Sequence, residues 1–164
     1  MAKRKPARPQ QAPAEAEQLG LEDLLGYNLR RAHYVQRARF QYVFAPHRIR
    51  PVQLSILGLL YQKSTLKQSE LSRAIEVKPA NMVALLDELE RRRVIVRRPA
   101  RTDRRSYAVQ LTPAGRRVTQ ELIRLHQRLE QDLAAYLGQD EYRELLRLLR
   151  KLRTADVAPD VEDT

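Results

Sequence analysis

The chain contains no cysteine and no tryptophan, and it has only three histidines and five glycines among 164 residues. Without cysteine it can form no disulfide, no thiolate metal site and no thiol-based redox sensor or nucleophile. The histidines, at positions 33, 47 and 126, lack the spacing of a metal site, so we expect no metal and no cofactor. No nucleophile–base pair is apparent, which argues against an enzyme.

Acidic residues and long apolar runs are also scarce. Lysine and arginine number 31 against 20 aspartates and glutamates, which gives a formal net charge of +11 at pH 7. Such an excess predicts a polyanionic partner, with nucleic acid favoured over a membrane surface. No apolar run approaches the roughly 18 residues that span a bilayer, and no secretory hydrophobic segment follows the basic start. We therefore expect a cytoplasmic protein without a membrane partner.

The length is that of one domain with a single core, and two tails flank it. Residues 1–18 are rich in proline, alanine and charge. They predict a disordered basic tail, which serves either solubility or contact with DNA. Residues 154–164 are acidic and predict a frayed end.

Between the tails, apolar residues recur mostly at helical spacing. Pro51, Pro79 and Thr112-Pro113 each suit the start of a helix, and Gly138 suits the end of one. The apolar residues of the segments at 52–61 and 79–92 predict buried faces. Helices are expected at about 21–44, 51–61, 68–75, 79–92, 113–137 and 140–152.

Residues 91–115 concentrate positive charge between two short runs of alternating apolar residues. Eight arginines stand between positions 91 and 105 against one acid, Asp103. The alternation predicts a β-hairpin with a basic tip and with one packed face, made by Val94, Val96, Tyr107 and Val109. A folded domain rarely gathers so much charge unless an anion lies against it. Four of the arginines are expected to form a solvated or DNA-backbone-facing strip: Arg91, Arg92, Arg97 and Arg98.

Two short helices joined by a tight turn and followed by a basic hairpin are typical of a winged helix-turn-helix. The second helix can enter the major groove, and the hairpin can contact the backbone or the adjacent minor groove. The predicted fold class is therefore mainly α with a small β-hairpin wing. We expect a DNA-binding lobe at 50–111 between helical segments at 19–49 and 112–153.

Two short motifs carry a resemblance to a known family. Asp103-Arg104-Arg105, followed by Leu111-Thr112-Pro113-Ala114-Gly115, resembles the wing motif D-x-R and L-T-x-x-G of the MarR (multiple antibiotic resistance regulator) family. The segment Leu66–Leu71 resembles the first motif helix of these dimeric winged-helix repressors, and Leu89–Arg92 the end of their recognition helix. The resemblance extends over about residues 20–153.

The resemblance implies a set of DNA contacts. Arg105 would enter the minor groove, oriented by Asp103 through a charge-assisted hydrogen bond, while Arg101 and Arg104 would contact phosphate. Asn81 either recognises adenine or is a polar surface residue, and Val83 or an alanine would meet a thymine methyl group. The recognition helix would present Lys78, Ala80, Asn81, Val83 and Ala84, and the preceding helix Gln68, Ser69 and Arg73. The first and last helices of the family form the homodimer.

Three departures from the family pattern concern local geometry. Lys67 stands where the family commonly has a threonine N-cap, which weakens that cap by about 1 kcal/mol. Glu76 and Arg93 stand where glycine is usual, and a left-handed conformation there would cost roughly 1 kcal/mol each. Ala84 stands where the recognition helix of the family frequently has an arginine, so the resemblance does not identify the bases that this helix would contact.

The first long helix carries arginines among aromatic residues. One interpretation is the solvated face of an amphipathic helix, and the other is a pocket for an anionic aromatic effector. The pocket would use Tyr27, Arg30, His33, Tyr34, Arg37 and Phe40. A looser likeness to regulators of aromatic-acid catabolism, some of which respond to aryl-CoA thioesters such as hydroxycinnamoyl-CoA, favours a phosphate-rich ligand. The absence of cysteine argues against the peroxide-sensing branch.

The sequence therefore predicts a ligand-responsive repressor that binds a pseudo-palindromic operator on double-stranded DNA as a homodimer. A small anionic aromatic compound or an aryl-CoA would release it. The alternative is a nucleoid or architectural protein that binds DNA without sequence preference, because that class explains the charge equally well.

Overall fold

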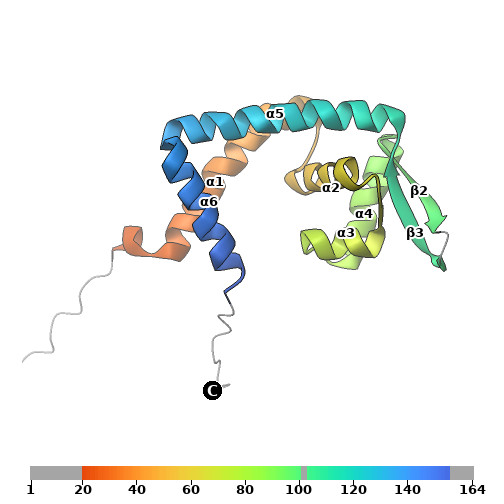
Figure 1. Cartoon of the computed structure of the whole chain (residues 1–164), viewed down its shortest axis with the longest axis horizontal. Helices are drawn as coiled ribbons and strands as arrows, with labels where there is room; N and C mark the ends of the chain where they lie inside the picture. The colour runs from red at the N-terminus through yellow and green to blue at the C-terminus, as the bar shows by residue number, and fades with distance from the viewer. Residues whose placement is uncertain (1–19, 101–102, 156–164) are drawn as a thin grey trace, which may run out of the picture. The chain divides into compact units, whose positions relative to one another are not determined.

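A computed structural model of the chain describes residues 20–100 and 103–155 (Figure 1). The chain divides into two units, residues 1–38 and 39–164, and the boundary falls inside the first long helix. In the described residues no helix is long and apolar enough to cross a membrane. The elements are η1 (Leu21–Asp23), α1 (Leu25–Phe44), η2 (Ala45–His47), α2 (Pro51–Lys63), β1 (Thr65–Lys67), α3 (Gln68–Ile75), α4 (Pro79–Arg91), β2 (Ile95–Ala100), β3 (Asp103–Leu111), α5 (Pro113–Leu137) and α6 (Gln139–Arg153).

The helices begin and end close to the predicted positions. Prolines occupy the first turn of α2, α4 and α5, where the missing backbone donor costs nothing. The helix expected at 21–44 is interrupted at Leu24, whose extended backbone separates η1 from α1. The left-handed conformations expected of Glu76 and Arg93 are confirmed, with φ angles of 57° and 58°.

The core lies in the second unit, where α2 packs against both α3 and α5 (Figure 1). The predicted burial of α2 and α4 is confirmed. Each helix turns one apolar row inward, and α3 adds a further leucine. The fully enclosed side chains include Phe44, Ile56, Leu57, Leu60, Leu71, Met82, Leu86 and Leu89.

The hairpin belongs to a three-stranded antiparallel sheet with the strand order β1-β3-β2. Strand β1 was not predicted from the sequence, because its three residues are too few to show an alternating pattern. It pairs Leu66 with Val109, and both side chains are buried. Strand β1 therefore joins the start of α3 to the base of the wing.

The predicted packed face of the hairpin is confirmed for Val94 and Val109, which are buried, and wrong for Val96 and Tyr107. Ile95 pairs with Leu111 and Arg97 with Val109, whereas Val96 pairs with Gln110 on the opposite face. Since directly paired residues share a face, the inward face carries Ile95 and Val109 together with Arg97. An arginine thus occupies the register position that the sequence pattern had assigned to a valine.

The start of α5 lies against the turn between α4 and β2. The Thr112 hydroxyl accepts a hydrogen bond from the Gly115 N–H at 2.8 Å, which confirms Thr112 as N-cap. The same hydroxyl donates to the carbonyl of Arg93 at 2.8 Å, and the Thr112 N–H donates to the carbonyl of Val94 at 3.0 Å. The L-T-x-x-G motif therefore connects the hairpin, the end of α4 and α5.

Helices α5 and α6 are connected by a hydrogen bond from a tyrosine to a carboxylate. Tyr142 Oη donates to Glu130 Oε2 at 2.5 Å. This bond, with partial burial of the ring, raises the pKa of Tyr142 to about 12. Because the neutral phenol is favoured in the folded chain, the associated stability is full below pH 10 and is lost as pH rises to about 12.

Replacing Tyr142 by phenylalanine is expected to lower the free energy of unfolding by about 1 kcal/mol at neutral pH. Tyrosinate absorbance of the native chain should show a phenol that titrates near pH 12 and disappears in Tyr142→Phe. Tyr136→Phe is the matched control, since Tyr136 is 82% exposed. Loss of a phenol that titrates near pH 10 in Tyr142→Phe, with the phenol near pH 12 retained, would contradict the assignment.

Candidate DNA-binding surface

Helix α4 presents one exposed face made of short side chains. Its opposite side is fixed in the core by Met82, Leu86 and Leu89, all with zero exposure. The first turn of α4 contains no acidic residue, so the positive end of its helix dipole is not neutralised there. All five residues expected on the outward face are exposed: Lys78, Ala80, Asn81, Val83 and Ala84. Small side chains allow this helix to approach a groove closely.

Helix α3 adds polar and basic groups beside α4. Ser69 and Arg73 are exposed and Gln68 is half-buried. The Lys67 side chain makes no cap hydrogen bond, as its identity predicted, and the Glu70 carboxylate instead accepts from the Lys67 N–H at 2.7 Å. The N-terminus of α3 is therefore held by Glu70.

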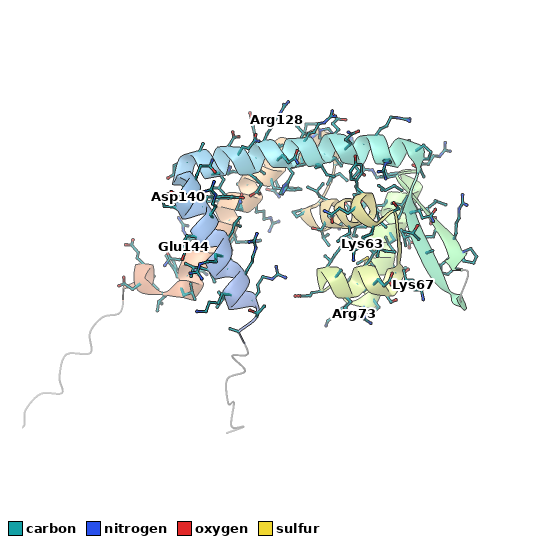
Figure 2. The ribbon with its side chains drawn as sticks, in the orientation of Figure 1. Lys63, Lys67, Arg73, Arg128, Asp140 and Glu144 are labelled. Atoms are coloured by element: carbon teal, nitrogen blue, oxygen red, sulfur yellow. The ribbon has the colours of Figure 1, made fainter. Side chains whose placement is uncertain are left out.

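Two lysines that were not predicted to contact DNA, Lys63 and Lys67, accompany Arg73. Figure 2 shows Lys63 and Lys67, around the end of α2 and β1, on the α3 side of the lobe, whereas Arg128 projects from α5 on the other side. Isolated lysines in a basic sequence carry no pattern that marks them. Their position beside α3 becomes apparent only from the fold, because Lys63 ends α2 and Lys67 ends β1.

The predicted residues of the wing tip lie at the limit of the described chain. Arg101 lies outside the described residues. Asp103, Arg104 and Arg105 belong to β3 by their backbone, and Asp103 pairs with Ala100. Their side chains lie outside the described part, so the contacts expected of them stay predictions.

The expected strip of four arginines at the base of the wing is wrong for Arg97. Its side chain is 22% exposed and contacts two acids of α4, Asp87 at 2.5 Å and Glu90 at 2.6 Å. Burial of the guanidinium lowers the pKa of Arg97, but the hydrogen bonds that it donates to Glu90 and Asp87 outweigh this effect and leave the pKa above its ordinary value. Two acids three residues apart on α4 are the sequence signal for this cluster.

A second arginine of the strip also has partners in the protein. Arg92 donates to the carbonyls of His47 and Arg48, both at 2.8 Å, and Glu88 one turn earlier pairs with Arg50. These bonds connect the end of α4 to the segment between α1 and α2. Arg91 and Arg98 are exposed, as expected.

Five of the six expected effector residues lie in the described part of the first unit. Arg30, His33, Tyr34 and Arg37 are exposed, and Tyr27 is half-buried with the Arg30 guanidinium 5.6 Å from its ring centre. The sixth, Phe40, belongs to the second unit. It is 8% exposed and stacks on Phe44, with ring centres 4.2 Å apart, so it is a core residue in this structure.

Comparison with known proteins places this surface in a family. A model of the MarR family matches residues 49–107, which contain α2 to α4 and most of the hairpin. A protein of Thauera aromatica, described as a transcriptional regulatory protein for the hcr operon, is 32% identical over 136 residues, 80% of each chain. The chain belongs to the MarR family. It is therefore a winged-helix transcriptional regulator that binds DNA, and not an enzyme.

Two solved structures of this family are similar over most of the chain. The transcriptional repressor CouR bound to a 23-mer DNA duplex is 35% identical, with a TM-score of 0.78 over 81% of this chain and 94% of its own. Bordetella bronchiseptica BpsR, whose DNA binding is regulated by 6-hydroxynicotinic acid, is 25% identical, with a TM-score of 0.78 over 84% of this chain and 99% of its own. These likenesses support the predicted recognition and fold class.

Proposed function

We propose that this MarR-family protein is a homodimeric repressor whose two α4 helices enter successive major grooves of a pseudo-palindromic operator. The exposed face of α4 is the observation that carries the proposal, because its short side chains lie opposite a rigid buried row. Asn81 would contact adenine and Val83 a thymine methyl group. Gln68, Ser69 and Arg73 on α3 would contact the backbone.

The dimer would use apolar faces that the single chain leaves exposed. Helix α6 alternates charged and apolar rows, yet none of its described side chains is buried. Leu145, Leu148 and Leu152 are between 41% and 47% exposed along one side of it. In the first unit, Leu21 and Leu25 are each 61% exposed. Contiguous exposed apolar rows on amphipathic helices favour association with a second copy.

DNase footprinting on the region upstream of the protein's own gene tests the proposal. One protected site with two half-sites about one helical turn, roughly 34 Å, apart is expected. The matched variant Asn81→Ala should change the sequence preference at one base pair per half-site, while Gln131→Ala on the exposed side of α5 should not. Uniform protection of all DNA would favour the nucleoid protein instead.

We further propose that a small anionic aromatic compound, or an aryl-CoA thioester, releases the operator. The support is a group of aromatic rings and guanidinium groups within one described segment of α1: Tyr27, Arg30, His33, Tyr34 and Arg37. Phe40 is not included, because it packs on Phe44. The regulation of BpsR by an aromatic acid favours the same ligand class here.

A thermal-shift panel of cinnamic and hydroxycinnamic acids and their CoA thioesters tests the effector. A bound ligand raises Tm by mass action, and an effector must also weaken operator binding, since it acts only through unequal affinity for the two states. Arg30→Gln and Arg37→Gln should reduce the shift, whereas Arg128→Gln on α5 should not. No shift with any thioester would exclude the CoA ligand.

A further inference from the structure

The ion-pair cluster of Arg97, Asp87 and Glu90 joins the wing to the recognition helix. Arg97 Nε donates to Glu90 Oε2 at 2.9 Å, and its terminal nitrogen donates to Asp87 Oδ1 at 2.5 Å. The backbone N–H of Arg97 also donates to Glu90 Oε1 at 3.0 Å. One carboxylate of α4 therefore holds both the main chain and the side chain of the same residue of β2.

Arg97 lies on an edge strand of the sheet, where its backbone N–H has no partner strand. Strand β2 lies at the edge of the order β1-β3-β2, so no strand pairs with its outer side. Glu90 accepts the Arg97 N–H that an edge strand would otherwise expose. Beyond Arg97 the hairpin continues through the pairs of Arg98 with Ala108 and Pro99 with Tyr107. The Arg97 cluster is thus the outermost described side-chain contact between α4 and the wing.

We propose that Arg97 is a positioning residue, which fixes the wing relative to α4 so that both engage DNA in one geometry. From Arg97 to the end of β2 at Ala100 the strand runs three residues, about 10 Å. A rotation of roughly 10° at Arg97 would therefore move this end of the strand by about 2 Å. Hydrogen bonds fail over smaller displacements, so a wing released at Arg97 would lose its contacts while α4 kept its own.

Arginine suits this task better than lysine. Its planar guanidinium contacts two carboxylates on α4 at once, which a single ammonium group cannot do with the same geometry. Arg97→Lys should therefore restore only part of what Arg97→Gln loses, although it keeps the charge. A contribution from charge alone would be rescued fully by lysine.

The proposal makes a direct prediction for the free protein. The chain has no cysteine, so Ala80→Cys on α4 and Tyr107→Cys on β3 provide two unique sites for spin labels. With labelled chains diluted into unlabelled protein, pulsed electron paramagnetic resonance should give one narrow distance distribution. Arg97→Gln and Glu90→Gln should broaden it, and Arg128→Gln should not. An unchanged width in Arg97→Gln would overturn the proposal.

A double-mutant cycle tests the consequence for DNA binding, which rests on the proposed function. Arg105→Ala is expected to weaken operator binding roughly 30-fold in the native background. Once Arg97→Gln has displaced the wing, the same change should cost less than about threefold, because the contact is already lost. Equal costs in both backgrounds would overturn the proposal.

Measurements of stability and of operator binding distinguish failure of the proposed function from failure of the positioning role. A cooperative melting transition of Arg97→Gln would show that the variant folds, and Arg97→Lys supplies a second variant in which most of the packing is kept. If the native chain binds no operator, both the proposed function and the positioning role are refuted. If it binds an operator and the distribution of label distances stays narrow in Arg97→Gln, only the positioning role is refuted.

Discussion

Replacing Gly115 by alanine is expected to destabilise the protein by about 3 kcal/mol and to lower Tm by roughly 10 °C. A Cβ at this position would lie 1.8 Å from the carbonyl oxygen of Val94 and 2.7 Å from its carbonyl carbon. Both atoms belong to backbone, so no side-chain rotation can relieve the overlap. The first turn of α5 would have to move away from the turn that connects α4 to β2.

The cost exceeds simple overpacking because the same carbonyl already has a partner. Val94 O accepts from the Thr112 N–H at 3.0 Å, and the Thr112 hydroxyl donates to the neighbouring Arg93 carbonyl. Moving α5 would strain this group of bonds together with the Thr112 cap. The glycine of the L-T-x-x-G motif is thus explained by close approach, since its backbone does not require a positive φ.

Gly58→Ala provides the matched control for this measurement. Gly58 lies in the middle of α2, and a Cβ there would meet nothing within 4 Å. Since alanine is favoured over glycine in a helix by about 1 kcal/mol, this variant should keep or raise Tm. Denaturation would be followed at one protein concentration, because association shifts Tm. Equal Tm values for Gly115→Ala and the native chain would refute the account of the motif.

The features that the sequence predicted correctly depend on neighbours close in the chain. Thr112 and Gly138 mark helix ends through hydrogen bonds within one turn, and Pro79 marks one through its fixed φ. The exposed face of α4 follows from helical periodicity around Met82 and Leu86. The left-handed turns at Glu76 and Arg93 are equally local. The exposed face of α4, which forms the candidate DNA-binding surface, could therefore be predicted from the sequence.

The features that it missed depend on pairing across the chain. Strand β1 forms because Thr65 pairs with Gln110, 45 positions away. A segment of three residues contains no sequence pattern from which such a distant pairing could be predicted. Arg97 looked like one basic residue among eight until the register placed it opposite Val109 and beside Glu90. Charge pattern alone cannot separate an arginine held by acids from one free to meet phosphate.

The contacts seen in the structure change which arginines are expected to contact DNA. Arg97 is bound to Asp87 and Glu90, and Arg92 to two carbonyls, so both contribute to the geometry of the lobe. Moving a guanidinium from these partners to phosphate would exchange several good hydrogen bonds for others and gain little. The basic hairpin is therefore expected to bind DNA through its other arginines, Arg98 and those nearer its tip.

Replacing Arg105 by alanine is expected to weaken operator binding by about 2 kcal/mol, roughly 30-fold in Kd. Arg105 is the arginine of the D-x-R motif and follows Asp103 in β3, the strand that forms the wing with β2. A guanidinium in the minor groove meets the most negative potential on DNA and displaces a counterion. Fluorescence anisotropy at several salt concentrations should show a salt slope that is lower by about one.

Arg128→Ala removes the same charge from α5, on the other side of the lobe from Arg73 (Figure 2), and should leave Kd within about twofold. If both variants bind like the native chain at moderate salt, Arg105 does not contact DNA and the wing engages the operator through other residues.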